Sequence, residues 1–95
     1  MRTAMNKIES YLIDRGLNPS HKGFYYIEEV LADILKNQDN LFHFHTRVEK
    51  QKAEQRGLNL ATYVRNINHE IKRATGETAG LFFGKAYLEL RENQQ

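Results

Sequence analysis

Polar side chains suited to base recognition recur at helical spacing in the second half of the chain. The apolar positions there fall at intervals of four, three and four residues: Leu60, Val64, Ile67 and Ile71. If these four face a core, the opposite side of a helix carries a polar stripe: Thr62, Arg65, Asn66, His69 and Arg73, flanked by Lys72. Arg can form paired hydrogen bonds with guanine, Asn can do so with adenine, and Thr can contact the thymine methyl group. The stripe therefore favours a DNA-reading surface, with an ordinary solvated helix face as the alternative interpretation.

A short turn precedes this stripe. Gly57 interrupts the helical pattern, and Asn59 can act as the N-cap of a helix that starts at Leu60. A helix, a glycine-containing turn and a strongly amphipathic helix together predict a helix-turn-helix over about residues 47–75. The predicted DNA-contacting set adds the cap residue and a tyrosine expected to be half exposed, and comprises Asn59, Thr62, Tyr63, Arg65, Asn66, His69, Lys72 and Arg73.

The charge distribution points to the same part of the chain. From Arg47 to Arg73 there are seven Lys and Arg residues against three acidic residues, a local charge of +4. The rest of the chain has seven basic and nine acidic residues, which leaves the whole at +2. A basic third on a slightly acidic body is the pattern expected of a surface that meets phosphate groups, although solvated helix faces can carry similar clusters.

Helical periodicity also describes the rest of the chain, and no strand-like alternation persists anywhere. Five helices are predicted, over about residues 4–15, 24–36, 41–56, 60–74 and 85–92. From Glu49 to Arg56 the third helix offers only Ala53 as a small apolar contact, so this half is expected to be poorly anchored. Gly76 and Gly80 are expected to mark a loop, followed by the apolar plug Leu81-Phe82-Phe83. The prediction is an all-α fold in a single compact domain over residues 1–95.

Length and composition limit the classes of protein. Ninety-five residues suit one domain with one core. The absence of cysteine removes disulfide scaffolds, thiolate nucleophiles and cysteine-type zinc sites. The start of the sequence, residues 1–7, has no apolar core of a signal peptide, and no apolar run is long enough to span a membrane. We therefore expect a soluble, cytoplasmic protein without a membrane partner.

Neither catalysis nor metal binding is predicted. His43 and His45 are two residues apart, which on a helix points their side chains about 200° apart, so they could share a metal only in an extended segment. The segment Gly80–Ala86 lacks the spacing of a phosphate-binding loop, which needs four residues between its glycines and Ser or Thr after the Lys. Paired carboxylates and serines have no catalytic context. We expect no enzyme activity and no cofactor.

Two stretches show a family resemblance. Residues 16–31 contain a glycine, an aliphatic residue and a short turn, and then a motif whose matching positions are Lys22, Gly23, Phe24, Tyr26, Ile27 and Glu29. Residues 59–71 combine Ala-Thr-x-Val with an Ile, a His and a second Ile at fixed spacing, and Leu81-Phe82-Phe83-Gly84 echoes a following Leu-Phe-Gly. Residues 8–84 thus resemble the C-terminal effector domain of stage zero sporulation protein A, a response regulator of endospore formation.

The resemblance implies an all-helical fold with a helix-turn-helix, sequence-specific binding of double-stranded DNA in the major groove, and pairing of domains on adjacent sites. The leading hypothesis is therefore a small DNA-binding transcriptional regulator. The alternative is a helical adaptor on the same scaffold that does not bind DNA. It would bind another protein, or a second copy of itself, through Tyr25, Tyr63 and neighbouring apolar side chains.

Overall fold

The computed structural model describes the backbone of residues 4–93 and the side chains of residues 7–91. Within residues 4–93 the chain forms six α-helices, one π-helical segment and no strand, which confirms the all-α prediction. The elements in chain order are α1 (Ala4–Asp14), α2 (Lys22–Lys36), α3 (Asp39–Phe42), the π-helix η1 (Phe44–Glu49), α4 (Lys50–Arg56), α5 (Leu60–Thr75) and α6 (Ala79–Asn93).

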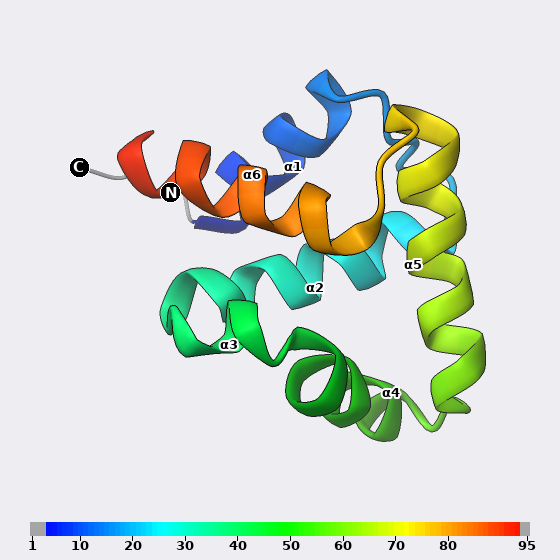
Figure 1. Ribbon diagram of the computed structural model, residues 1–95. Helices are drawn as coiled ribbons and strands as arrows, with labels where there is room; N and C mark the ends of the chain where they lie inside the picture. Colours follow the sequence, from blue (N-terminus) through cyan, green and yellow to red (C-terminus); the bar gives the residue numbers. More distant parts are fainter. Residues whose placement is uncertain (1–3, 94–95) are drawn as a thin grey trace.

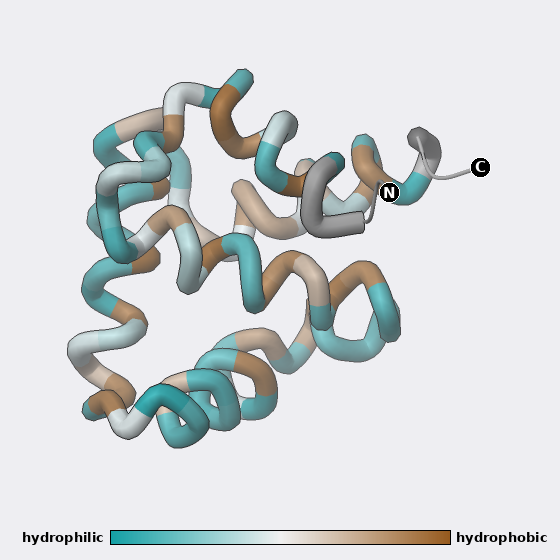
Figure 2. The backbone as a smooth tube through the Cα atoms, turned by 180° about the vertical axis from the view of Figure 1, so that it is seen from behind, coloured by the Kyte–Doolittle hydropathy of each residue, from teal (hydrophilic) through white to brown (hydrophobic). Residues whose placement is uncertain are grey.

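Helix α2 is the centre of the fold. It packs against α5, α1, α6 and the η1–α4 segment (Figure 1). Its sequence repeats apolar residues at helical spacing, so Phe24, Ile27, Leu31 and Ile34 are all fully or almost fully buried. Apolar and polar residues alternate along the other helices too (Figure 2), as expected where each element covers one side of a common core. Helix α5 lies at the edge of the molecule in both views.

The predicted third helix is three elements in the structure. A break at His43 separates α3 from η1, which runs directly into α4. The expectation that residues 49–56 are poorly anchored is wrong, because Val48, Glu49 and Ala53 are buried. The wider π-turn places the neighbouring residues Val48 and Glu49 together on the inner side. Glu49 thus occupies a position that apolar periodicity cannot reveal.

The last helix begins six residues earlier than predicted. Helix α6 starts at Ala79, so Gly80 and the Leu81-Phe82-Phe83 segment are helical and do not form a loop. The Thr78 hydroxyl oxygen accepts a 3.4 Å hydrogen bond from the Leu81 N–H, a capping interaction that starts the helix. Phe82 and Phe83 are buried in the core, and this burial outweighs the low helix propensity of the glycines.

None of the described helices is long and apolar enough to cross a membrane.

Candidate nucleic-acid interface

Two helices and a tight turn form the helix-turn-helix arrangement predicted from the sequence. Helix α4 ends at Arg56, and Gly57 takes a left-handed conformation with φ of 70°, which glycine adopts without strain. The Leu58 N–H donates to the Ala53 carbonyl at 2.9 Å and closes the end of α4. Asn59 caps α5, since its side-chain oxygen accepts a 2.8 Å hydrogen bond from the Ala61 N–H. The turn is therefore fixed by local interactions at both ends.

A partly buried polar cluster ties both helices of the arrangement to α2. Arg56 pairs with Glu29 of α2 through Nε at 3.0 Å and a terminal nitrogen at 2.5 Å. The Tyr63 hydroxyl of α5 donates to the same carboxylate at 2.8 Å. The Tyr63 ring stacks on the Tyr26 ring with centroids 4.5 Å apart. The Arg56 guanidinium lies over the Tyr26 ring, 4.9 Å from its centroid. This cluster, Glu29, Arg56, Tyr26 and Tyr63, holds α4 and α5 in a fixed relation.

A second polar cluster fixes the other end of α5. Glu70 is 2% exposed and accepts hydrogen bonds from the backbone N–H of Asn18 at 2.8 Å and from Arg73 at 2.6 Å, with Nδ1 of His21 also 2.8 Å away. Burial alone would raise the pKa of Glu70, but these hydrogen bonds and the Arg73 charge lower that pKa to about 2. The carboxylate is therefore ionised and fully paired at neutral pH.

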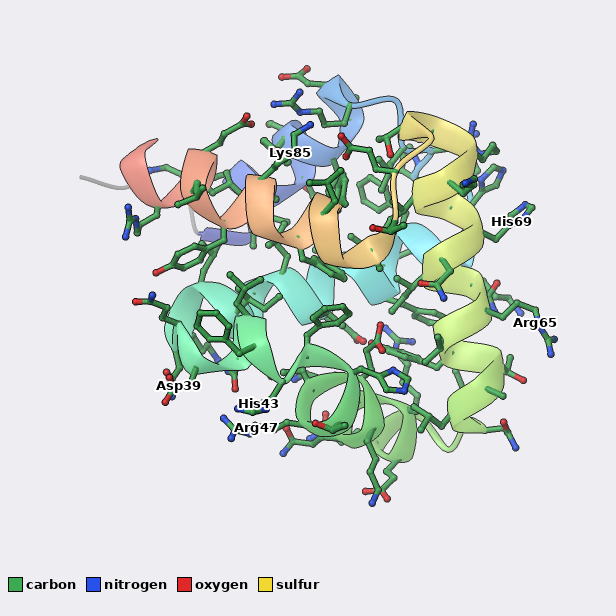
Figure 3. All side chains as sticks on the ribbon, viewed as in Figure 1. Asp39, His43, Arg47, Arg65, His69 and Lys85 are labelled. Carbon is green, nitrogen blue, oxygen red and sulfur yellow. The ribbon has the colours of Figure 1, made fainter. Side chains whose placement is uncertain are left out.

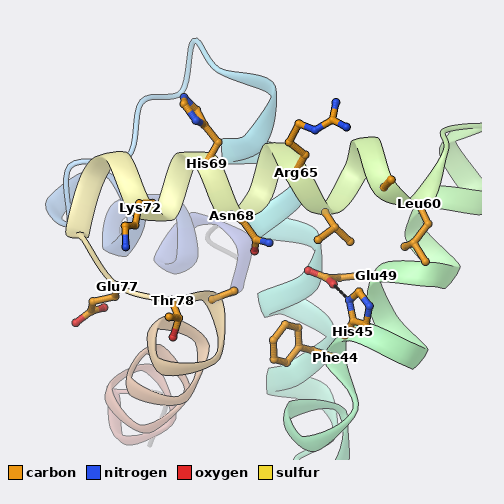
Figure 4. Close-up of a pocket in the computed structure, with 13 residues that line it drawn as sticks. Phe44, His45, Glu49, Leu60, Arg65, Asn68, His69, Lys72, Glu77 and Thr78 are labelled. Carbon is orange, nitrogen blue, oxygen red and sulfur yellow. Dashed lines mark hydrogen bonds and ion pairs between the residues drawn. The ribbon is translucent and has the colours of Figure 1, made fainter.

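The outer face of α5 is left with basic and neutral side chains. Glu70 is the one acidic residue among the sixteen of the helix, and it is buried. Arg65 and His69 point away from the body of the molecule (Figure 3), and Lys72 is also exposed. Among the described residues neither Arg65 nor Lys72 has an ion-pair partner. We call Arg65, His69 and Lys72 the outer face; Lys72 lies at its border, with its side chain directed toward the start of α6 (Figure 4).

The remaining predicted contact residues differ in how free they are. Thr62 is exposed next to the outer face, and Asn59 is exposed but engaged as the cap. Asn66 is half-buried, and its side-chain nitrogen donates to the Thr62 carbonyl at 2.8 Å. Arg73 is held by Glu70 and also donates to the Gly16 carbonyl at 3.2 Å. The side chains of Asn66 and Arg73 are thus engaged in hydrogen bonds within the protein and are less available to DNA.

Tyr63 is a correction to the predicted set. It was expected to be half exposed, yet it is 0% exposed and can contact neither DNA nor a protein partner. Tyr26 is buried as well, whereas Tyr25 is 42% exposed as expected. The buried stripe of α5 is Tyr63, Ile67, Glu70 and Ile71, and the predicted core residues Leu60 and Val64 lie half-buried at its edge. Tyr63 fits on the buried side because its ring stacks on Tyr26 and its hydroxyl finds a carboxylate partner in Glu29 of α2.

The basic third is partly neutralised inside the fold. Of its seven basic residues three form ion pairs: Lys52 with Asp33, Arg56 with Glu29, and Arg73 with Glu70. Two of its three acidic residues, Glu49 and Glu70, are buried. The exposed charge of this region therefore stays positive, but its unpaired bases are fewer than the sequence suggests.

A groove beside the outer face was not predicted. It lies between α5, η1 and the start of α6, and its volume is about 1070 Å³ (Figure 4). Its walls are largely apolar, and the residues that line it are Phe44, His45, Glu49, Leu60, Ala61, Val64, Arg65, Asn68, His69, Lys72, Glu77, Thr78 and Ala79. The only sequence signal that could have indicated the groove is the four-residue spacing of His45 and Glu49. In the structure Nδ1 of His45 lies 2.8 Å from Oε1 of Glu49.

The four histidines do not meet in the fold. His21 contacts Glu70 and His45 contacts Glu49. The described residues contain no group of three or more His, Asp or Glu side chains arranged to hold a metal ion.

In comparisons with protein-family models, curated proteins and solved structures, the chain matches none.

Proposed function

We propose that the protein is a cytoplasmic, sequence-specific DNA-binding regulator that places the outer face of α5 in the major groove. Arg65, near the start of the helix with Thr62, would read base edges, and Lys72, two turns later, would contact phosphate. The two motif stretches that resemble the sporulation effector domain support the same function. The observation that carries the proposal is that the sixteen-residue helix α5, at the edge of the molecule, exposes basic side chains and no acidic side chain.

Charge and shape both support insertion of α5. Figure 1 shows α5 at the edge of the molecule with no described helix beyond it, and the α1–α2 loop approaches its C-terminal part, where Asn18 and His21 contact Glu70. A helix of this kind fits a major groove about 12 Å wide. Arg73 covers the buried Glu70 and neutralises the negative charge that would repel phosphate. The positive charges of Arg65 and Lys72 remain unpaired and can attract phosphate. The fold thus separates the paired charges from the unpaired ones on a single helix.

The test is selection of bound duplexes from a random pool, followed by fluorescence anisotropy on the selected duplex and a scrambled one. Arg65→Ala should cost about 1 to 3 kcal/mol on the selected duplex and little on the scrambled one. Lys72→Ala should weaken both duplexes and lower the slope of log affinity against log salt by about one. Arg91→Ala is the matched control, because the substitution removes the same positive charge from an exposed position on α6, far from α5.

Equal and weak affinity of the parent protein for both duplexes, unchanged in Arg65→Ala, would contradict the proposal and favour the adaptor alternative. Burial of Tyr63 removes one of the two tyrosines on which that alternative was based. The exposed Tyr25 remains available to a protein partner.

A further inference from the structure

The groove beside α5 has the form of a small-molecule site. Its volume of about 1070 Å³ lies just above the range of about 300 to 1,000 Å³ typical of ligand pockets. Phe44, Leu60, Val64 and Ala79 give it apolar walls that come from three separate elements. A compound in this groove would bury apolar surface against all three at once.

A buried carboxylate with one free oxygen lies in the wall. Glu49 is 1% exposed, and its Oε1 lies 2.8 Å from Nδ1 of His45. Its Oε2 is buried and has no hydrogen-bond partner among the described residues. Figure 4 shows the carboxylate in the middle of the lining, between His45 and the side chains of α5. A buried oxygen without a donor is costly, so it marks the point at which a donor is missing.

The charges around the groove single out this carboxylate. Arg65 and His69 point to the far side of α5, and Asn68 points toward the groove (Figure 4). Lys72 lies at the opposite end of the groove from Glu49, beside Glu77 and Thr78. Glu77 at the far end is already paired with Lys85 at 2.5 Å. Glu49 is thus the carboxylate in the groove with a hydrogen-bond partner for one oxygen, Oε1, and none for the other, Oε2.

We propose that this groove binds a small apolar amine whose protonated nitrogen donates a hydrogen bond to Oε2 of Glu49. The aromatic or aliphatic part of the compound packs against Phe44, Leu60 and Val64. Because Oε2 is covered, binding requires neighbouring groove side chains to shift, while His45 keeps its contact with Oε1. Burial raises the pKa of Glu49, and an ammonium group beside it restores the ionised form. This site does not depend on the DNA-binding proposal.

Three compounds with one indole-ethyl skeleton test the donor requirement: tryptamine, tryptophol and indolepropionate. Each compound is titrated into the ¹⁵N-labelled protein without DNA, and NMR spectra are recorded. Tryptamine should shift the amide signals of the groove residues. The expected affinity is at least about tenfold higher for tryptamine than for tryptophol, since a hydrogen bond to a charged group is stronger than a neutral one. Indolepropionate should bind weakest, because it brings a second negative charge to Glu49.

Two variants locate the site. Glu49→Gln keeps the shape but removes the charge, and should abolish the preference of tryptamine over tryptophol. Ala61→Phe adds bulk at an exposed lining position and should weaken tryptamine and tryptophol alike. Thermal melts of both variants check that each is folded, and Lys36→Ala, at an exposed position at the end of α2 and outside the groove lining, is the control that should bind as the parent does.

Absence of groove shifts at millimolar tryptamine would overturn the proposal. Equal binding of tryptamine and tryptophol, or a preference that survives in Glu49→Gln, would overturn it as well. Because these measurements contain no DNA, they are independent of whether the outer face of α5 binds a duplex.

Discussion

Gly23 marks the closest approach of two helices. A Cβ atom at this position would lie 2.5 Å from the Asn66 carbonyl oxygen and 2.9 Å from the Glu70 Cβ. Because the first of these is backbone, α2 and α5 would have to move apart to make space. Glycine in this motif therefore has a packing reason that spacing alone does not reveal.

Gly23→Ala is expected to lower the free energy of unfolding by about 1 to 3 kcal/mol, as overpacking does. Gly84→Ala is the matched control, because Gly84 lies inside α6 with open space around it. That change should raise stability by about 0.5 to 1 kcal/mol through helix propensity. Urea denaturation of the two variants measures both effects, and an unchanged Gly23→Ala midpoint would show that α2 and α5 do not meet there.

The Tyr63 hydroxyl is the polar group of a fully buried side chain, and it has a hydrogen-bond partner. Its donor reaches Glu29, and burial raises the pKa of the phenol with that hydrogen bond adding to the effect. Tyr63→Phe should destabilise the protein by about 1 to 2 kcal/mol, since Glu29 then loses one buried donor. Tyr25→Phe, at the exposed neighbour of the stacked ring, should stay within about 0.5 kcal/mol. Equal melting of the two variants would contradict the buried-cluster assignment.

At the scale of the element, α5 distinguishes two positions that periodicity treats alike. Ile67 is fully buried, while Val64 is half-buried beside the groove. Ile67→Asn should therefore cost about 3 to 5 kcal/mol, from lost burial and an unpaired amide, and leave the domain largely unfolded. Val64→Asn should cost about 1 kcal/mol, because its amide can still meet water. Circular dichroism melts compare the two, and equal losses would place Val64 in the core.

At the scale of the whole molecule, two buried carboxylates give stability opposite pH dependences. Burial, together with the nearby charges of Glu9 and Glu29, raises the pKa of Glu28 to about 7 from its ordinary value of 4.5. Glu28 binds protons more tightly when folded, so stability rises as the pH falls from 7 toward 4.5. The pKa of Glu70 is lowered to about 2, so its stabilisation is present above pH 4.5 and is lost as the pH falls toward 2.

Stability should therefore peak at about pH 5. Glu28→Gln should reduce the decline between pH 5 and 7, to which Glu49 also contributes because burial raises its pKa, and should stabilise the protein at pH 7 by on the order of 2 kcal/mol. Glu54→Gln, at an exposed position of α4, should leave the profile unchanged. Urea midpoints across this pH range test the prediction, which fails if stability increases steadily up to pH 7.

The sequence by itself determined the elements that depend on local interactions. Gly57 and Asn59 act through their own turn, and the apolar period of residues 24–36 and 60–74 requires amphipathic helices, so these were predictable. The break at His43, the π-helix after it and the early start of α6 depend on which side chains the core accepts. Phe82 and Phe83 are buried in that core, where Phe82 packs near Tyr11 of α1 and Phe83 near Phe44 of η1.

The site depended still more on tertiary structure. Periodicity defines a stripe about a third of a helix wide, and residues at its edge, such as Tyr63 and Val64, are assigned by whatever lies opposite. Tyr63 is buried with its hydroxyl bonded to Glu29, and Glu70 pairs with Arg73 and so takes that residue out of the set available to DNA. The groove and the free oxygen of Glu49 exist because η1 and α6 meet α5 across residues far apart in sequence. Such contacts follow from packing and buried-charge pairing, which local spacing does not encode.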